Sequence, residues 1–488
     1  MNKSSLNKDS LQEVKFWPIM IAIFFGSFIT VLSSSTVTIA IPQLQEHFAT
    51  DLHLVQWTMT GFMLAMGTIS PVAGYLGEKF SYKRLYFTAL IGFTLASLLC
   101  ALSWNIQSLI AFRIVQGIFS GLIMPATMTI IYQVIPRDKQ AMAISLWGLS
   151  AMLAPAIGPT LAGVLMAMGG WQWLFIMNIP IGVIATAMVM WLIPFYRLNV
   201  PKSFDLPGLV TVFISSISLL VAFSQSGSWG WTDWKTVTLF IVGGIVLILF
   251  IWRELTVKEP LLNIRVLTNG RYTLTLIITT IITISLYSGT FLTPIFLQNI
   301  QHVSPLDTGL ILLPASLAMA LTMPIVGKFY SVVGPRLLMT IGIVLVIVGT
   351  FALTKLTIDI SYMYILIWMM VRNVGIAFTM MPASNAGMEQ ISPMLSGHAS
   401  SLSNWIRNVF GSFSIAIFTS LLGTFGSREA AAILQSGVQD AAQIQLLSFT
   451  ASVNDVYLVA TVIAILAVPL TLMVRKNKAR APQLDTSK

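Results

Sequence analysis

Long apolar stretches alternate with short polar connections along almost the whole chain. About 20 consecutive apolar residues form a helix that is long enough to cross the hydrocarbon core of a bilayer. The repetition of such stretches predicts an all-α polytopic membrane protein with fourteen membrane-spanning helices. These spans are expected at residues 16–40, 54–76, 84–103, 107–131, 141–167, 173–194, 207–226, 236–253, 272–296, 307–327, 336–354, 361–382, 397–423 and 453–474.

The composition supports this pattern. Of the 488 residues, 56% are hydrophobic and only 9% are charged, and the mean hydropathy is +0.84. Soluble proteins carry about 25% charged residues, so an ordinary soluble protein is excluded. The polar stretch 1–15 runs directly into a full-length span, which argues against a short cleavable signal.

The basic residues indicate the orientation of the chain in the membrane. The formal net charge is +10, which taken alone could suggest a nucleic-acid partner. However, placing the N-terminus in the cytoplasm puts all but six of the 27 Lys and Arg residues on the cytoplasmic side, as the positive-inside rule requires. We therefore expect both termini in the cytoplasm and no nucleic-acid partner. The six exceptions are Lys235, Lys355 and Arg428 on the outer side and Arg113, Arg372 and Arg407 within spans.

The expected span 141–167 has an unusual composition for a helix. Glycine and proline weaken a helix in water, but neighbouring helices in a membrane can satisfy the backbone groups that proline leaves free. Residues of this kind at spacings of four form a smooth ridge that another helix can approach closely. Such a ridge indicates either a tight packing helix or an element that bends during conformational change. The residues concerned are Gly148, Pro155, Gly158, Pro159 and Gly163.

Two adjoining motifs resemble those of a known family. Gly148, the run Ala154–Pro159 and Gly163 resemble the antiporter motif in the fifth helix of the major facilitator superfamily. Directly afterwards, Trp171–Gly182 resembles the W-R-W-x-F-x-x-N-x-P-x-G signature of its fourteen-span drug:proton antiporter branch, with Gln172 in place of the arginine. The resemblance extends over most of the chain and implies the fold and transport class of that family.

The chain also repeats itself at intervals of about 250–260 residues. Gly74–Arg84 is repeated by Gly327–Arg336, and Arg113 by Arg372. With the resemblance, this repeat implies two six-helix bundles and two inserted helices, for which we expect a spacer or lipid-facing role. The expected units are a cytoplasmic tail at 1–15, a bundle at 16–194, the inserted helices 7 and 8 with their loops at 195–271, a bundle at 272–474 and a cytoplasmic tail at 475–488.

The loop after the second span resembles the G-x-L-x-D-R-x-G-R-K motif of the family, with Glu78 at the position of the acid. The resemblance implies that this acid helps to hold the two halves together on the cytoplasmic side, through charge pairs and a helix N-terminus. A merely topogenic basic loop is the alternative. The gating candidates in this loop are Gly74, Glu78, Lys83 and Arg84.

Arg113 lies in the predicted fourth span, in a segment that resembles the R-x-x-Q-G motif of the family. An arginine inside the membrane costs about 2.5–3.5 kcal/mol on insertion scales, so it should face a cavity or polar partners. The resemblance links Arg113 to proton transfer. A structural arginine bonded to backbone carbonyls is the alternative.

The first span departs from the family at the place where an acid is expected. Residues 32–42 resemble the pattern L-D-x-T-V-V-N-V-A-L-P, but Ser33 occupies the position of the acid. None of the seventeen Asp and Glu residues falls in the middle of a predicted span. Coulomb's law in a low dielectric then favours neutral, zwitterionic or anionic substrates over cations.

Other titratable groups are candidates for proton coupling beside Arg113. Asp307 lies in the first turn of the predicted tenth span, where an acid also simply complements the helix dipole. His398 lies at the start of the thirteenth span and titrates in a useful range, although a surface histidine is the simpler interpretation.

Several side chains are candidates to line a central substrate cavity, and ordinary helix packing explains each of them about as well. These candidates are Ser33, Met63, Gln116, Met124, Trp147, Asn178, Arg372, Asn404 and Arg407.

The sequence contains no motif of an enzyme. It has no Walker motif, no His/Cys/Glu cluster with metal spacing and no nucleophile beside a plausible base. The single cysteine, Cys100, excludes an intrachain disulfide. We therefore expect no catalysis, no metal and no cofactor.

These observations together predict a secondary active multidrug efflux transporter in a bacterial-type plasma membrane. It would export small amphipathic compounds in exchange for protons by alternating access, as a monomer. One alternative is a specific exporter of a single endogenous metabolite, lipid or antibiotic, with sodium or potassium as the coupling ion. Another is a membrane sensor or scaffold that does not transport.

We predict weak efflux of permanently divalent amphipathic cations, because a midplane site with arginines and no acid repels a double positive charge. The measurement is the growth of cells producing the protein in the presence of a bis-quaternary compound, compared with cells carrying the empty vector. Robust resistance would contradict the prediction.

Overall fold

The computed structural model describes residues 16–70, 72–195, 205–257, 260, 262–391, 395–435 and 440–474. The expected tails at 1–15 and 475–488 lie outside these residues. The described elements are all helical. They are α1 (Phe16–His47), α2 (Leu52–Val55), α3 (Trp57–Ile69), α4 (Val72–Phe80), α5 (Tyr82–Ala101), α6 (Ile106–Val134), α7 (Arg137–Gly169), α8 (Trp173–Ile176), α9 (Asn178–Leu192), α10 (Leu206–Trp229), α11 (Trp234–Thr256), η2 (Ile264–Thr268), α12 (Gly270–Asn299), α13 (Pro305–Val333), α14 (Pro335–Ala352), η3 (Leu353–Lys355), α15 (Tyr362–Met388), α16 (Ser396–Gln435), α17 (Ala441–Ile465) and α18 (Ala467–Met473).

Twelve helical segments of the described chain are long and apolar enough to cross a membrane. The expected fourteen spans are therefore not all recovered. The span predicted at 54–76 is divided between α3 and α4, and the sequence carries Pro71, which cannot donate a backbone hydrogen bond, between them. The span predicted at 141–167 lies in α7, whose described apolar run covers only Ile157–Gly169.

Two helices extend well beyond the predicted spans. α16 continues to Gln435 rather than ending near residue 423, and α17 begins at Ala441 rather than near residue 453. The additional turns are rich in Ala, Gln and Leu, which are good helix formers. Hydropathy alone therefore located the apolar part of each helix but not its polar continuation.

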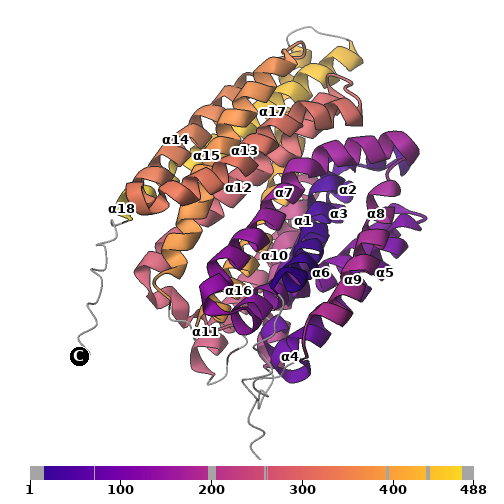
Figure 1. The fold of residues 1–488 in the computed structure, drawn as a ribbon. Coiled ribbons are helices and arrows are strands. Elements are labelled where there is room, and N and C mark those ends of the chain that lie inside the picture. The colour runs from indigo at the N-terminus through magenta and orange to yellow at the C-terminus, as the bar shows by residue number, and fades with distance from the viewer. Residues whose placement is uncertain are drawn as a thin grey trace, which may run out of the picture.

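The helices form two groups that lie side by side (Figure 1). In the first group, α1 to α9, α5 packs against α6 and α9, and α1 packs against α7 and α9. In the second group, α12 to α18, α15 packs against α12, α13 and α14, and α16 packs against α17. We call these the N-terminal group and the C-terminal group.

Glycines allow the helices within a group to approach closely. On α6, Gly117 and Gly121 are four residues apart and face α3. A Cβ atom on Gly117 would meet the backbone of Phe62, and one on Gly121 would meet the backbone of Met66. This is the small-xxx-small packing typical of membrane helices. Close contact between backbones holds such helices together, because the hydrophobic effect does not drive their association in lipid.

The two groups meet chiefly through α7 with α13 and α3 with α16. Hydrogen bonds cross between the groups near the end of the bundle where α1, α7 and α12 finish. There the Thr160 hydroxyl donates to the Gly309 carbonyl at 3.1 Å, and the Gln298 side chain donates to the Ile39 carbonyl at 3.1 Å. We call this the closed end of the bundle.

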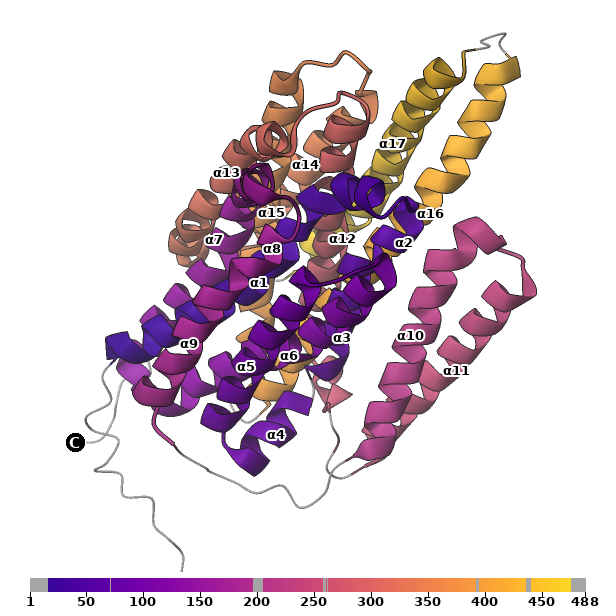
Figure 2. The ribbon, with the colours of Figure 1, turned by 90° about the vertical axis from the view of Figure 1, so that its right-hand side faces the viewer.

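The hairpin α10–α11 stands at the edge of the bundle beside α3 and α16 (Figure 2). α10 is bonded to both groups, because Gln56 Nε2 donates to Ser224 Oγ at 2.6 Å and the hydroxyls of Ser226 and Ser420 are 3.0 Å apart. α11 leaves large apolar side chains exposed, such as Ile248 at 67%. A lipid-facing helix is expected to show such a surface.

We predict opposite effects for two Gly→Ala substitutions. Gly117→Ala should lower the stability by about 1–3 kcal/mol, because the added methyl group meets the backbone of α3. Gly244→Ala on α11 should be neutral or stabilising by up to about 1 kcal/mol. The added Cβ atom would meet no described atom outside its own helix backbone within 4 Å, and alanine favours the helix. Thermal unfolding in detergent measures both. Equal stability of the two variants would contradict the packing described.

Candidate functional site

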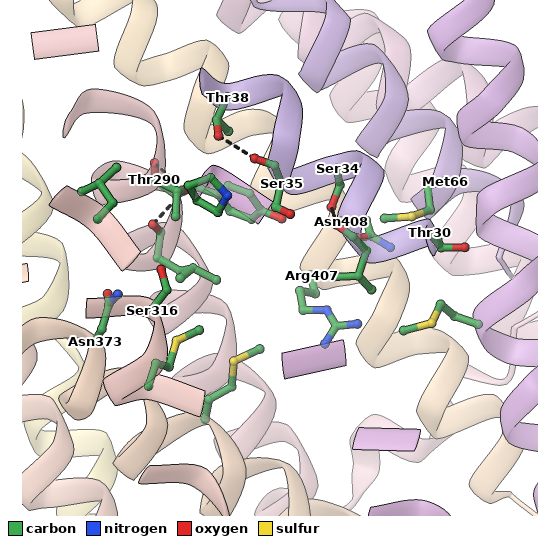
Figure 3. A pocket seen from close by; sticks show the side chains of 18 of the residues that line it. Thr30, Ser34, Ser35, Thr38, Met66, Thr290, Ser316, Asn373, Arg407 and Asn408 are labelled. Carbon is green, nitrogen blue, oxygen red and sulfur yellow. Dashed lines mark hydrogen bonds between the residues drawn. The ribbon is translucent and has the colours of Figure 1, made fainter. Parts of the chain in front are cut away.

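A cavity of about 200 Å³ lies between the two groups, at middle depth in the bundle. Its walls come from α1, α3, α6 and α7 of the N-terminal group and α12, α13, α15 and α16 of the C-terminal group. Figure 3 shows the side chains of both groups pointing toward the space between them. A site formed jointly by two groups of helices changes its shape whenever the groups move relative to each other.

Hydroxyl groups line the α1 wall. Thr30, Ser34 and Thr38 are four residues apart and therefore share one helix face. Their hydrogens are already donated along the same helix: Ser34 bonds to the Val31 carbonyl and Thr38 to the Ser35 carbonyl, each at 2.7 Å. Such hydroxyls present mainly oxygen lone pairs to the cavity, so this wall accepts hydrogen bonds.

Much of the remaining lining is sulfur-containing. Methionine is flexible and polarisable, and it adapts to ligands of different shapes. The methionines in the lining are Met66, Met124, Met319, Met323, Met369 and Met380.

Arg407 carries the one formal charge among the lining residues that the structure describes. Asn404, Arg407 and Asn408 share one face of α16, and Arg407 Nη2 donates to Asn404 Oδ1 at 2.6 Å. Of the cavity candidates predicted from the sequence, Met124, Asn404 and Arg407 lie in the lining.

Arg113 lies behind the cavity in a buried network. It is fully buried; its Nε donates to the Thr58 carbonyl at 2.9 Å and its Nη1 to Gln116 Oε1 at 2.6 Å. The Ser33 hydroxyl accepts from Arg113 Nη1 at 3.2 Å and from Asn178 Nδ2 at 3.4 Å. The structure thus brings four predicted site residues together, although as a polar support for α1, α3, α6 and α9 rather than as cavity lining.

Arg372 occupies a similar position in the C-terminal group. It is fully buried, and its Nη2 donates to the Leu286 carbonyl at 3.3 Å and to Ser288 Oγ at 3.2 Å. Its Nη1 donates to Asn373 Oδ1 at 3.3 Å, and Asn373 lines the cavity. Both arginines therefore donate to a backbone carbonyl of a neighbouring helix, and one nitrogen of each guanidinium, Arg113 Nη2 and Arg372 Nε, is buried without a hydrogen-bond partner among the described residues.

Two further cavity candidates also lie outside the lining. Met63 is buried in the core, where its methyl group packs on Gly411 of α16. Trp147 is half-buried and donates from Nε1 to the Thr127 hydroxyl at 3.1 Å.

The remaining proton-coupling candidates lie at opposite ends of the bundle. Asp307 is exposed near the closed end, where its carboxylate accepts from Ser304 Oγ at 2.7 Å and its amide donates to the same hydroxyl. This is a helix cap. His398 is half-buried in the first turn of α16, and its Nδ1 accepts from the Asn263 amide at 3.3 Å.

The structure reveals buried acids that the sequence did not single out. Glu254 was expected in a loop beyond the span 236–253, but it lies fully buried in the last turn of α11 and accepts from the Leu262 amide at 2.9 Å. Nearby, Asp205 caps α10 and pairs with Arg253 Nε at 2.6 Å. Hydropathy gave no signal for this burial, because it does not show that the Leu262 amide reaches Glu254 or that Arg253 pairs with Asp205.

Three gating candidates on α7 contact neighbouring helices: Pro159 and Gly163 contact α13, and Gly158 contacts α1. A Cβ atom on Gly163 would lie 2.7 Å from the Pro305 carbonyl oxygen, and one on Gly309 would lie 2.6 Å from that of Pro159. Gly158 instead faces Ser35 of α1, and a Cβ atom on Gly148 would meet no described atom of another element within 4 Å. The side chain of Pro155 lies outside the described part of the chain.

The loop candidates make contacts within the N-terminal group. The Tyr82 hydroxyl donates to the Gly74 carbonyl at 3.3 Å, and Lys83 Nζ donates to the Met190 carbonyl at 2.8 Å. Arg84 lies 5.0 Å from the ring centre of Phe195. The side chain of Glu78 falls among those that the structure does not describe.

Comparison with known proteins identifies related chains. The family model of the Major Facilitator Superfamily matches residues 23–415. The multidrug resistance protein B homolog of Mycobacterium tuberculosis (strain H37Rv) is 30% identical over 395 residues, which cover 80% of this chain and 73% of that protein. The lincomycin resistance protein LmrB of Listeria monocytogenes is 29% identical over 468 residues, which cover 96% of this chain and 98% of that protein.

The fold is similar to that of a solved transporter. The crystal structure of the peptide transporter POT in complex with sulfate matches with a TM-score of 0.66 at 14% sequence identity. The match covers 97% of this chain and 100% of that chain.

We predict that the three intramembrane arginines respond differently to replacement by lysine. Arg113→Lys and Arg372→Lys should each lower the stability by about 1–3 kcal/mol, because lysine cannot reproduce the fork of hydrogen bonds and leaves buried acceptors unpaired. Arg407→Lys should change it by less than about 1 kcal/mol, because this side chain faces the cavity. Thermal unfolding of the purified variants tests this. An equal loss for all three would contradict the distinction.

Proposed function

The chain belongs to the Major Facilitator Superfamily and is an integral membrane transporter, not an enzyme, and from this premise we propose the work that it does. It is a secondary active exporter of small amphipathic compounds, driven by exchange for protons through alternating access. Relatives named for multidrug and lincomycin resistance support the export of foreign compounds.

The observation that carries this proposal is the cavity at middle depth, which both helix groups line. Its methionines can follow the shape of different apolar bodies, and its hydroxyl and amide groups supply a few polar contacts. This combination fits a transporter that accepts several amphipathic compounds better than one that is specific for a single polar metabolite.

In this proposal the closed end faces the outside of the cell. The positions of the Lys and Arg residues support this orientation, with both termini in the cytoplasm of a bacterial-type cell. The cavity then loads from the cytoplasm or the inner leaflet. Export requires that α7 and α13 separate at Pro159, Gly163 and Gly309 while the other end closes.

The proposed topology has fourteen spans. It treats α3 with α4, and the whole of α7, as membrane-crossing elements in addition to the twelve long apolar segments. The chain then divides into six-helix bundles at 16–194 and 272–474, with 195–271 inserted, and works as a monomer. The length of α7 supports its inclusion as a span, because 33 residues at 1.5 Å per residue extend about 50 Å.

Proton coupling is proposed to act on the contacts between helices rather than on a carboxylate in the cavity. Asp307 is the leading candidate, because its neighbour Leu306 lies directly against Gly163 at the closed end. His398 bonds to the connection before α12, and Arg113 supports α1 and α3. Protonation of Asp307 would weaken the cap of α13 beside that contact.

The proposal is tested with everted membrane vesicles and a panel of neutral and anionic amphipathic dyes. An imposed pH gradient should drive dye accumulation against its concentration gradient, and an uncoupler should collapse it. Accumulation driven by sodium or potassium instead, or persisting with the uncoupler, would contradict proton exchange. Absence of movement for every dye would contradict transport of this class.

A matched pair of glycine variants sharpens the test. Gly309→Leu should reduce dye accumulation at least about 10-fold, because the added side chain blocks the approach of α7 and α13 that alternating access requires. Gly244→Leu, where nothing lies within 4 Å of the added carbon, should retain accumulation. Full activity of Gly309→Leu would show that closure of this end is not needed.

A further inference from the structure

We propose that Arg407 anchors the acidic group of the substrate, so that the cavity prefers amphipathic monoanions to neutral or cationic compounds of similar shape. This inference rests on the proposed function in one respect, namely that the cavity is the substrate site. The ligands concerned are compounds with one carboxylate, sulfonate or acidic phenol on an apolar body.

The described lining of the cavity carries one positive charge. Among the described lining residues, Arg407 is charged and all others are hydroxyl, amide, aromatic, thioether or aliphatic groups. A single cation in such surroundings has a strong, weakly screened field. A ligand with a negative charge gains from this field, and a cation of the same shape is repelled by it.

Arg407 is available for a ligand, whereas Arg113 and Arg372 are not. Arg113 and Arg372 are fully buried and donate to carbonyls and side chains of neighbouring helices. Arg407 is only half-buried, and its hydrogen bond to a described residue uses Nη2 alone. Its other donors can bind a carboxylate in the planar, two-bonded manner that guanidinium favours.

The Arg407 guanidinium is held in position before a ligand arrives. The bond of 2.6 Å to Asn404 comes from the same helix, three residues earlier. Figure 3 shows the Arg407 side chain extending into the space between Ser316 on one side and Met66 on the other.

The rest of the lining defines the remainder of the ligand. The Ser34 and Thr38 hydroxyls use their hydrogens within α1 and can accept a hydrogen bond from a ligand N–H or O–H group. The methionines surround an aromatic or aliphatic body. A matching ligand has one acidic group, an apolar ring system and a hydrogen-bond donor.

Three dansyl compounds with the same ring system test the preference. Dansylglycine is an anion at neutral pH, dansylamide is neutral and dansylcadaverine is a cation. Their binding to the purified full-length protein in detergent is measured by energy transfer from tryptophan to the dansyl group. Wild-type protein should bind dansylglycine about 10- to 100-fold more tightly than dansylcadaverine, the range expected for charge-assisted hydrogen bonds.

The variants are Arg407→Gln, Arg407→Lys and the control Arg428→Gln. Arg407→Gln should weaken dansylglycine binding about 10- to 100-fold and leave dansylamide within about 3-fold. Arg407→Lys, which keeps the charge but not the fork, should lie between wild type and Arg407→Gln. Arg428→Gln removes the same charge from an exposed position on the same helix and should leave all three affinities unchanged.

Several results would overturn the assignment: no dansylglycine binding, equal binding of the three dyes by wild-type protein, or unchanged dansylglycine affinity in Arg407→Gln. The comparison of dyes on wild-type protein needs no variant, so a misfolded Arg407→Gln does not prevent a decision. Charge-selective binding without pH-driven transport would support the anchor and contradict the proposed function. Transport of dansylamide without a preference for dansylglycine would support the proposed function and contradict the anchor.

Discussion

The backbones of α7 and α13 touch at a place where side chains would not fit. Gly163 lies against the backbone of Pro305, and Gly309 lies against that of Pro159. In a bilayer, where apolar surface provides little net attraction between helices, such close contact and the hydrogen bond from Thr160 hold the two groups together. Pro159 also lines the cavity. The same contact that joins the groups therefore closes one end of the site.

Three arginines illustrate how the fold handles charge near a cavity whose described lining contains no acid. Arg113 and Arg372 correspond to each other in the internal repeat, and each donates to carbonyl, amide or hydroxyl groups, while Arg113 also lies 4.0 Å from the ring centre of Phe62. Arg407 faces the cavity instead. Arg113 and Arg372 are thus buried between helices, whereas the charge of Arg407 faces the cavity. The buried acids in the described part of the chain, Asp205 and Glu254, lie at the base of the α10–α11 hairpin.

Most of the membrane-spanning helices could be predicted from the sequence, because apolar runs of this length are a direct consequence of the bilayer. The predicted span 207–226 and the observed α10 (Leu206–Trp229) agree closely. Positions of single side chains could be predicted less well. Ser33, Gln116 and Asn178 were expected in a cavity but form the network around Arg113, since hydropathy does not reveal which face of a helix meets which neighbour. The role of Asn373 in the lining, next to Arg372, was missed for the same reason.

In the proposed cycle the two helix groups move as units and open the cavity at alternate ends. Distances between spin labels test it most directly, in a background in which the one cysteine, Cys100, is replaced. One pair, at the exposed residues Trp104 and Asp359, reports on the closed end, and a second pair, at Lys79 and Val332, reports on the other. We expect acidification with a bound dye to lengthen one distance while it shortens the other. Transport that proceeds while both distances stay constant would contradict this movement of the two helix groups.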